Sequence, residues 1–293
     1  ETVIFDNDVS ASQFKKLEEL LEVTVIDRAT LILEIFAIHA TTNEGKLQVE
    51  LAQRKHLLPR ILGQGKVLSR QGGGGAGGGG ARRGGGEQQL ELDRRTIREE
   101  IRDLEDKLEK LSKERSLRRE RREKSRIKVV SIVGYTNAGK STLMNALTKA
   151  GVLEENKLFA TLDPVSRKLW LGPNKEFIII DTVGFISRLP HELVKAFHST
   201  LEETRRSDLI LHVVDSASKN MLKEFDTVNS VLTEIGAGEV PRIVVLNKCD
   251  KQESKLLPCA EGCVIISAKK GDGLETLKEK ISIQLFGEAV EWE

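Results

Sequence analysis

The sequence contains few aromatic residues, few cysteines and no long apolar run. Aromatic residues make up 4% of its 293 residues, and three cysteines are an odd number for a disulfide scaffold, so a reduced intracellular protein is favoured. No apolar run approaches the roughly 20 residues of a membrane-spanning helix. We therefore expect no membrane partner, and the pattern predicts no secretory leader. Lys and Arg total 46 against 45 Asp and Glu, so net charge indicates no class of partner.

Residues 1–27 form the first of three regions that differ in texture. They predict a strand at Thr2–Phe5, a helix beginning near Ser10 as N-cap, and a second strand at Val23–Asp27. Two strands and one helix cannot bury a core alone. We therefore expect this region to be the remnant of an N-terminal α/β subdomain whose beginning is absent.

Residues 28–126 predict two long helices separated by a Gly-rich loop at residues 72–86. In the second helix, apolar residues recur at coiled-coil spacing. The apolar residues of the two helices are Leu31, Ile35, Ile38, Leu47, Leu51, Leu58 and Ile61, then Leu90, Ile97, Ile101, Leu104, Leu108 and Leu111. The pattern predicts an antiparallel, coiled-coil-like helical hairpin. Its glycine loop cannot form a packed core.

Residues 127–293 alternate short apolar runs with amphipathic stretches. This alternation predicts an α/β domain, a mostly parallel sheet with helices on both faces. The expected strands are Ile127–Val133, Phe177–Ile180, Leu209–Val214, Ile243–Leu246 and Val264–Ile266, and the expected helices are Ser141–Ala150, Pro190–Arg206, Lys219–Ile235 and Leu274–Phe286. A further strand at Arg167–Leu171 would add an antiparallel edge hairpin.

A phosphate-binding motif follows the first of these strands. The pattern G-x-x-x-x-G-K-[ST] is matched by Gly134, Tyr135, Thr136, Asn137, Ala138, Gly139, Lys140 and Ser141. Between a strand and a helix, its backbone N–H groups can surround a phosphate, and the helix N-terminus adds partial positive charge. Lys140 would reach the β- and γ-phosphates, and Ser141 would ligate Mg²⁺. The domain is therefore predicted to be a P-loop nucleotide-binding domain.

A second motif follows the strand Phe177–Ile180. It consists of Asp181, Thr182, Val183 and Gly184; the carboxylate can hold Mg²⁺ through water, and the Gly184 N–H can sense a γ-phosphate. Between the two motifs lie Phe159, Ala160, Thr161, Leu162 and Asp163. Thr161 is a candidate for a second magnesium hydroxyl, although a solvated loop threonine fits the position equally well.

The base is indicated by two further motifs at strand ends. They are Asn247, Lys248, Cys249 and Asp250, and then Ser267, Ala268 and Lys269. An ionised Asp250 can accept hydrogen bonds from the N1–H and exocyclic amine of guanine, whereas adenine offers no such donor pair. Asn247 would brace the loop, the Lys248 stem can lie along the ring, and a backbone N–H of the second motif can meet guanine O6. The four motifs together predict a site for GTP and GDP.

The residue after Gly184 is Phe185, where many GTPases have a Gln that orients the attacking water. We therefore expect slow intrinsic hydrolysis, with Lys140, Asn137, Thr161 and Gly184 as the catalytic set. Asn137 resembles the Asn of GTPases in which K⁺ replaces an arginine finger; alternatively, it merely tolerates the loop geometry. Arg167, Arg188 or a partner in trans are other sources of the missing group.

Basic residues are concentrated where acidic ones are missing, between Glu50 and Glu87. The candidates for RNA contact are Arg54, Arg60, Lys66, Arg70, Arg82 and Arg83. They can neutralise a phosphate backbone that small glycines let approach. Aromatic residues for base stacking are absent there, so backbone and shape contacts with RNA are favoured.

Several strings resemble the HflX family of ribosome-associated GTPases. They are GKLQVELAQ (45–53), LSRQGG (68–73), LELDRR (90–95), GYTNAGKS (134–141), FATLDP (159–164) and DTVGF (181–185). The resemblance implies binding to the large (50S) ribosomal subunit, with the hairpin directed at ribosomal RNA, and a role in ribosome splitting, rescue or maturation. It also shows departures: the N-terminal subdomain is largely missing and the glycine run is longer than usual.

These features predict a monomer in a bacterial-type cytoplasm, with an organelle matrix as the other possibility. The alternative function is a GTP-controlled coiled-coil module that mediates self-association or a protein contact.

Overall fold

The computed structural model describes residues 1–7, 9–71, 83–124, 127–148, 165–173, 175–186, 203–251 and 262–290. Within these ranges, the backbone alone is described for residues 62–71, 83–90 and 115–124. The described residues fall into two compact units, with the boundary along the chain between Glu114 and Arg115. None of the described helices is both long and apolar enough to cross a bilayer.

The first unit begins with a small parallel sheet. Strands β1 (Thr2–Phe5) and β2 (Thr24–Asp27) pair from Thr2 with Thr24 to Phe5 with Asp27, and helix α1 (Ala11–Leu21) connects them. The predicted N-cap is confirmed, because Ser10 directly precedes α1. The Ser10 N–H donates to Gln13 Oε1 at 2.9 Å, so a side chain of the first turn accepts the N-cap hydrogen bond.

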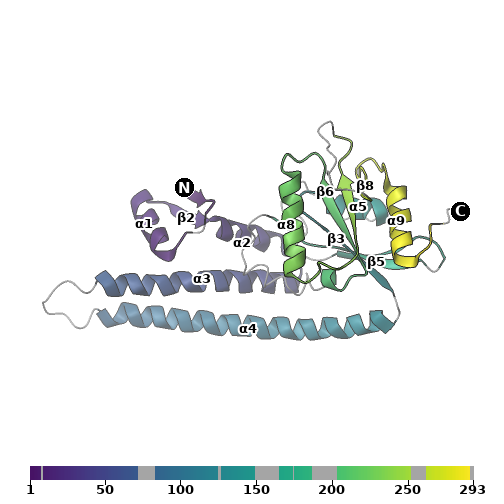
Figure 1. The fold of residues 1–293 in the computed structure, drawn as a ribbon. Helices are drawn as coiled ribbons and strands as arrows, with labels where there is room; N and C mark the ends of the chain where they lie inside the picture. Colours follow the sequence, from purple (N-terminus) through teal and green to yellow (C-terminus); the bar gives the residue numbers. More distant parts are fainter. Residues whose placement is uncertain are drawn as a thin grey trace. The chain divides into compact units, whose positions relative to one another are not determined.

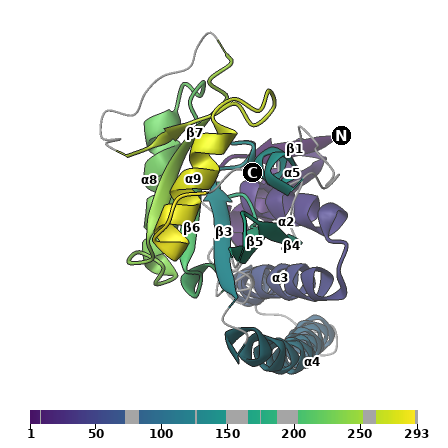
Figure 2. The same ribbon diagram turned by 90° about the vertical axis from the view of Figure 1, so that its right-hand side faces the viewer.

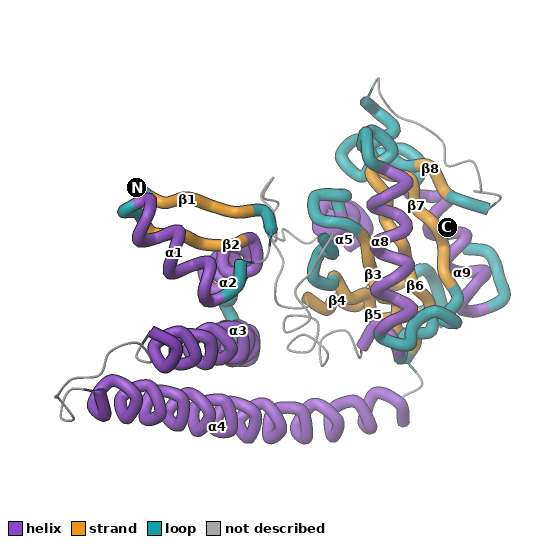
Figure 3. The backbone as a smooth tube through the Cα atoms, turned by 60° about the vertical axis from the view of Figure 1, so that its left-hand side comes forward, coloured by secondary structure: helices purple, strands orange, loops and turns teal. Residues whose placement is uncertain are grey.

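Three helices follow, and two of them form the predicted hairpin. They are α2 (Arg28–His39), α3 (Asn43–Gln71) and α4 (Arg83–Lys124). Helices α3 and α4 lie side by side and antiparallel (Figures 1 and 3). Ion pairs join them, from Arg54 to Glu100 at 3.0 Å and from Lys55 to Glu105 at 2.7 Å. Ile97 and Leu104 of α4 are buried, as coiled-coil spacing requires.

The first helix of the predicted hairpin is interrupted at residues 40–42. Ala40 is extended, and the Thr42 Oγ1 accepts a hydrogen bond from the Gly45 N–H at 3.0 Å, which caps a new helix. Helices α1 and α2 both pack on α3. The strand–helix–strand segment and the hairpin therefore belong to one compact unit, where the sequence suggests two separate regions.

The second unit contains a six-stranded sheet in the order β4-β5-β3-β6-β7-β8. All neighbours are parallel except β4 and β5, which form the predicted antiparallel edge hairpin. The strands are β3 (Lys128–Gly134), β4 (Val165–Trp170), β5 (Glu176–Asp181), β6 (Leu209–Asp215), β7 (Arg242–Asn247) and β8 (Val264–Ile265). The predicted sheet is thus confirmed.

Helices cover both faces of this sheet. Helices α5 (Lys140–Thr148) and α9 (Leu274–Phe286) contribute to one large apolar cluster with β3 and β6, whereas α8 (Met221–Glu234) packs on the other face through Met221 against Val214. Strands β6 and β7 lie between α8 and α9 (Figures 1 and 2). The predicted helix at Pro190–Arg206 lies outside the described residues except for its end.

Candidate nucleotide-binding site

The carboxyl ends of the parallel strands bring the sequence motifs to one edge of the sheet. Strand β3 ends at Gly134, β5 at Asp181, β6 at Asp215 and β7 at Asn247. This edge is where open α/β sheets bind ligands. The phosphate loop (residues 134–141), the D-x-x-G segment (residues 181–184) and the guanine loop (residues 247–250) therefore become neighbours.

The phosphate loop depends on two glycines for its close packing. A Cβ at Gly134 would lie 2.3 Å from the Val213 carbonyl oxygen. A Cβ at Gly139, whose φ is +94°, would lie 2.2 Å from the Asn247 Nδ2. Both glycines of the motif are thus needed to fit the loop against β6 and the guanine loop, in addition to any approach of backbone to phosphate.

Lys140 is the buried cation of this loop. It is 6% exposed, and its Nζ donates to the Tyr135 carbonyl oxygen at 3.1 Å. Burial lowers the pKa of Lys140 to about 8, and the charge of Lys248 adds to that effect, while Asp181 opposes it. A phosphate bound by the loop would stabilise the charged form of this side chain.

A hydroxyl and a carboxylate lie together beside Lys140. The Ser141 Oγ donates to the Asp181 Oδ2 at 2.7 Å, and Asp181 is fully buried. Oxygen donors of these two kinds suit Mg²⁺, so the residues present fit that ion. Thr161 lies outside the described residues, as do its neighbours Phe159, Ala160, Leu162 and Asp163.

The D-x-x-G segment is attached to the phosphate loop through its backbone. The Phe185 N–H donates to the Gly134 carbonyl at 3.1 Å, and the Phe185 carbonyl accepts from the Thr136 N–H at 2.8 Å. A Cβ at Gly184 would lie 2.9 Å from the Lys140 Nζ. The Phe185 side chain is 3% exposed, so it packs in the interior and cannot orient a water molecule.

Two other residues of this segment are also held inside the protein. Val183 is buried, and the Thr182 Oγ1 donates to the Ile132 carbonyl at 2.7 Å. The segment is therefore fixed to strand β3 as well as to the phosphate loop.

Asn247 links three loops with one side chain. Its Nδ2 donates to the Ala138 carbonyl at 2.9 Å, and its Oδ1 accepts from the Ala268 N–H at 3.0 Å. The side chain is 2% exposed. The relative position of the phosphate loop, the guanine loop and the segment after β8 is therefore fixed by Asn247.

Asp250 carries the carboxylate that would read guanine. The Ser267 hydroxyl donates to its Oδ1 at 2.8 Å. This hydrogen bond, with the charges of Lys270 and Lys269 nearby, lowers the pKa of Asp250 below its usual range despite opposing desolvation. The carboxylate is thus ionised at neutral pH. The preceding residue is Cys249, whose N–H donates to the Ile266 carbonyl at 3.1 Å. Burial raises the pKa of the Cys249 thiol.

The candidates for the missing catalytic group lie in different parts of the unit. Asn137 is exposed with a φ of +61°, a left-handed conformation that Asn adopts more readily than most residues. This agrees with an Asn that tolerates the loop geometry, and it leaves the side chain exposed. Arg167 lies on the edge strand β4, and its Nη1 donates to the Ser166 carbonyl at 3.0 Å. Arg188 lies outside the described residues.

One contributor to the site is absent from the four motifs. Asp215 ends β6, and its Oδ2 accepts a hydrogen bond from the Lys248 Nζ at 2.7 Å. The signal that could have found it is a polar residue directly after a buried strand, the same signal that marks Asp181 and Asn247.

Two of the candidate RNA-binding arginines already have acidic partners. The Arg60 Nη2 lies 2.6 Å from the Oδ2 of buried Asp27, and its guanidinium stacks over the Phe14 ring at 4.2 Å. Arg54 pairs with Glu100. Only the backbone is described at Lys66, Arg70 and Arg83, and Arg82 lies outside the described residues.

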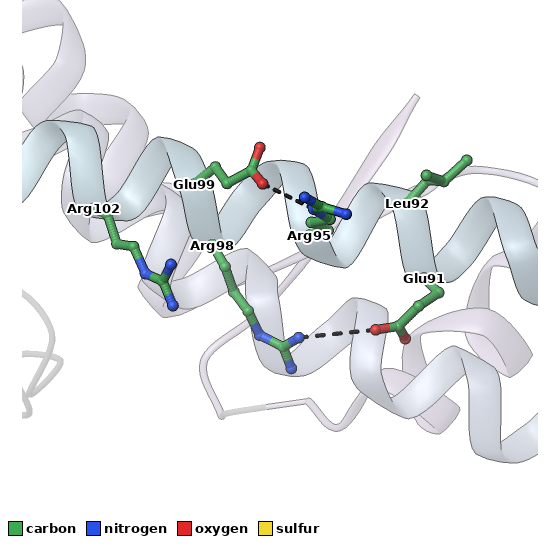
Figure 4. Close-up of a pocket in the computed structure, with 6 residues that line it drawn as sticks. All are labelled: Glu91, Leu92, Arg95, Arg98, Glu99 and Arg102. Carbon is green, nitrogen blue, oxygen red and sulfur yellow. Dashed lines mark hydrogen bonds and ion pairs between the residues drawn. The ribbon is translucent and has the colours of Figure 1, made fainter.

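Basic side chains further along the hairpin are also paired. A pocket of about 700 Å³ lies along α4 and is lined by Glu91, Leu92, Arg95, Arg98, Glu99 and Arg102. Figure 4 shows these six side chains. Arg95 pairs with Glu99 at 2.9 Å and Arg98 with Glu91 at 4.0 Å. The charge of this surface is therefore mixed rather than uniformly positive.

Three family models match successive parts of the chain. They are "GTP-binding GTPase N-terminal" over residues 1–37, "GTP-binding GTPase Middle Region" over residues 39–122, and "50S ribosome-binding GTPase" over residues 129–248. The third spans the phosphate loop, the D-x-x-G segment and the start of the guanine loop.

Named relatives extend over nearly the whole chain. The GTPase HflX of Caldanaerobacter subterraneus subsp. tengcongensis is 52% identical over 98% of this chain and 65% of its own length. The GTPase HflX of Escherichia coli K12 is 45% identical over 99% of this chain and 68% of its own length. The chain thus spans about two thirds of the length of these relatives.

A solved structure is similar to this chain over nearly its whole length. The crystal structure of a GTP-binding protein from Sulfolobus solfataricus in complex with GDP aligns with 98% of this chain and 81% of its own, with a TM-score of 0.56 and 27% identity. The strand-end motifs, the three consecutive family models and the named relatives agree: the chain belongs to the GTPase HflX family.

Proposed function

We propose that this chain binds GTP and GDP and hydrolyses GTP to GDP and phosphate. The observation that carries the proposal is the link made by Asn247, which joins the guanine loop to the phosphate loop at one sheet edge. A nucleotide lying along that edge would place its base at Asp250 and its phosphates at Lys140. The names of the relatives, and the GDP bound to the solved neighbour, support the same substrate.

Guanine selectivity follows from the state of Asp250. Its ionised carboxylate can accept two hydrogen bonds from guanine, and with adenine it would lose hydration without gaining a donor pair. Ser267 holds one carboxylate oxygen from the side, so the orientation of the acceptor is set in advance. Preorganisation of this kind lowers the entropic cost of binding.

The residues that would hold Mg²⁺ are Ser141 and Asp181, with Thr161 as the candidate for a second hydroxyl. The ion, when bound, neutralises charge on the β- and γ-phosphate oxygens. Lys140 would stabilise the same charge from the other side, and Gly184 would donate its backbone N–H to the γ-phosphate. Because Phe185 is buried, none of these groups orients the attacking water, and intrinsic turnover would be slow.

Potassium at Asn137 is our candidate for the missing catalytic group. Turnover with K⁺ would exceed turnover with Na⁺ several-fold, and Asn137→Ala would remove the difference. Equal rates in the two salts would overturn this assignment and leave Arg167, Arg188 or a partner in trans as the source.

The nucleotide proposal is tested by exchanging the base-reading carboxylate. Asp250→Asn replaces an acceptor by an amide donor, which suits the C2 carbonyl of xanthine rather than the amine of guanine. We expect GDP affinity to fall by at least about a hundredfold and xanthosine diphosphate affinity to rise. Titration of a fluorescent nucleotide measures both. Equal affinity of the wild-type protein for GTP and ATP would overturn the proposal.

The proposed partner is the large ribosomal subunit, bound through its RNA in the cytoplasm by a monomer of this chain. The matched family description and the acid-free span between Glu50 and Glu87 support it. Because Arg54 and Arg60 have acidic partners, we assign the RNA contacts to Lys66, Arg70, Arg82 and Arg83. Such binding would serve ribosome splitting, rescue or maturation.

Sedimentation of large subunits tests this partner. Binding should be strongest with a non-hydrolysable GTP analogue and should fall steeply as salt rises, because phosphate contacts release counterions. Replacement of Arg82 and Arg83 by Gln should weaken binding to the subunit. Replacement of the two exposed arginines Arg95 and Arg98 by Gln is the matched control and should leave binding unchanged. Weak binding that is equal in the GTP-analogue, GDP and nucleotide-free states, together with a dimer by light scattering, would favour the coiled-coil module instead.

A further inference from the structure

Asp215 occupies the position between the two nucleotide-binding loops. It is the last residue of β6 and pairs in register with Asn247, the last residue of β7. Strand β6 lies between β7 and β3 in the sheet, and β3 leads into the phosphate loop. A side chain at this strand end can therefore contact both the guanine loop and the phosphate loop.

Both carboxylate oxygens of Asp215 accept hydrogen bonds. Oδ2 accepts from the Lys248 Nζ at 2.7 Å, and Oδ1 accepts from the Ala217 N–H at 3.0 Å. The side chains of Lys248 and Asp215 are 18% and 16% exposed. A charge-assisted hydrogen bond in such a place is stronger than one between neutral groups or on an open surface.

The Lys248 ammonium makes a second contact that crosses to the phosphate loop. Its Nζ donates to the Asn137 carbonyl oxygen at 2.7 Å. The backbone φ of Lys248 is +65°, a left-handed conformation that a non-glycine residue keeps only where its surroundings hold it. The stem of Lys248 thus stands in one orientation, beside the place expected for the base.

The next residue anchors the other side of the guanine loop. The Ser216 Oγ and N–H both donate to the Asn247 carbonyl, at 2.7 Å and 3.0 Å, and Ser216 is buried. Asp215 and Ser216 therefore fix two successive residues of the guanine loop: Lys248 through its side chain and Asn247 through its backbone.

We propose that Asp215 is a positioning residue for guanine nucleotide binding, which holds the Lys248 ammonium and thereby aligns the guanine loop with the phosphate loop. The inference rests on the proposed GTP site. It differs from a local role in which Asp215 only closes the turn through Ala217. Asn at position 215 separates the two roles, because its amide oxygen can still accept from the Ala217 N–H while the negative charge is lost.

The test is a double-mutant cycle read by the dissociation constant of a fluorescent GDP. Asp215→Asn and Lys248→Met should each weaken binding by about tenfold to a hundredfold. The double variant should bind no more weakly than Lys248→Met alone, because Asp215 acts through Lys248. Asp215→Glu should recover part of the loss. Asp226→Asn, an exposed change on α8, is the matched control and should bind as wild type.

The outcomes separate this inference from the proposed function. If wild type binds GDP and Asp215→Asn binds it equally well, the positioning role is overturned and the GTP site stands. If wild type binds no guanine nucleotide, both are overturned. If Asp215→Asn does not fold, Asp215→Glu takes its place in the cycle. Asp215→Glu must then weaken GDP binding in the wild-type protein and leave it unchanged in the Lys248→Met variant. An equal loss of affinity in both proteins contradicts the proposal.

Discussion

Each compact unit holds a cation that is shielded from solvent: the Arg60 side chain is half-buried and Lys140 is buried. The two cations are neutralised to different degrees. In the first unit the Arg60 guanidinium lies 2.6 Å from the Asp27 carboxylate and also donates to the Thr30 hydroxyl at 3.0 Å. In the second unit the Lys140 ammonium donates to a neutral carbonyl oxygen, that of Tyr135. The Arg60 charge therefore has a carboxylate within hydrogen-bond distance, whereas within the described part of the second unit no ion pair joins a carboxylate to the Lys140 ammonium.

The titration of the two sites reflects this difference. Burial alone would raise the pKa of Asp27, but hydrogen bonds from His56, Thr30 and Arg60 hold it well below its usual range. Burial of Lys140 instead lowers its pKa to about 8. The first site is complete without a ligand and stabilises the fold. The second disfavours its own charge until an anion arrives, which is typical of a binding site.

The largest effect is expected from breaking the complete pair. Arg60→Met would leave the Asp27 carboxylate buried without its cation, at a cost of about 3–5 kcal/mol in the free energy of unfolding. GDP affinity should not change. Urea unfolding followed by circular dichroism measures the loss, and adding Asp27→Asn should recover much of it. Arg95→Met, which removes an exposed pair on α4, is the control and should cost less than about 0.5 kcal/mol. Equal losses in the two variants would contradict the comparison.

A smaller effect, in binding rather than stability, is expected at the incomplete site. Lys140→Met should weaken GDP binding by about tenfold to a hundredfold, because a charge-assisted bond to phosphate is lost. The nucleotide-free protein should unfold at the same temperature or a higher one, because a buried cation has been removed. Lys223→Met on the exposed side of α8 should change neither property. Destabilisation of the nucleotide-free protein by Lys140→Met would show that its charge belongs to the fold.

The smallest effect concerns pH. The pKa of Lys140 falls from 10.5 to about 8 in the folded chain, so between these values the unfolded chain binds a proton that the folded chain has released. The contribution of Lys140 to the free energy of unfolding therefore rises with pH across that window. GDP affinity should move the opposite way, by about tenfold between pH 7.5 and pH 9, because phosphate binding needs the ammonium. Lys140→Arg keeps its charge over this range, and its affinity should stay level.

Much of the second unit could be predicted because its signals are local. Each motif is a short string directly after a buried strand, so periodicity and composition place Lys140, Asp181 and Asn247 at the same sheet edge before any contact is known. The burial of the Phe185 ring could not be predicted in this way. It depends on the hydrogen bonds between the D-x-x-G segment and the phosphate loop, and the local sequence does not predict these bonds.

Less of the first unit could be predicted, because its key contacts join residues far apart in the sequence. Arg60 looks like one member of a basic, acid-free stretch, because its partner Asp27 lies 33 residues away along the chain and no period connects them. Helical spacing likewise runs on through residues 31–61 and hides the interruption at Ala40. Thr42 was the available signal there, since Thr is a common helix N-cap, but propensity alone does not overrule periodicity.

The contact between Gly139 and Asn247 also constrains how this protein can evolve. A methyl group at position 139 would collide with the Asn247 amide, 2.2 Å from its nearest atom. A smaller residue at position 247 would relieve the collision but would leave the Ala138 carbonyl and the Ala268 N–H without that partner. Neither position can therefore drift first without loss, and libraries that randomise one of them should return almost only the original residue. The two residues are therefore expected to change only together, although they lie 108 positions apart in the sequence.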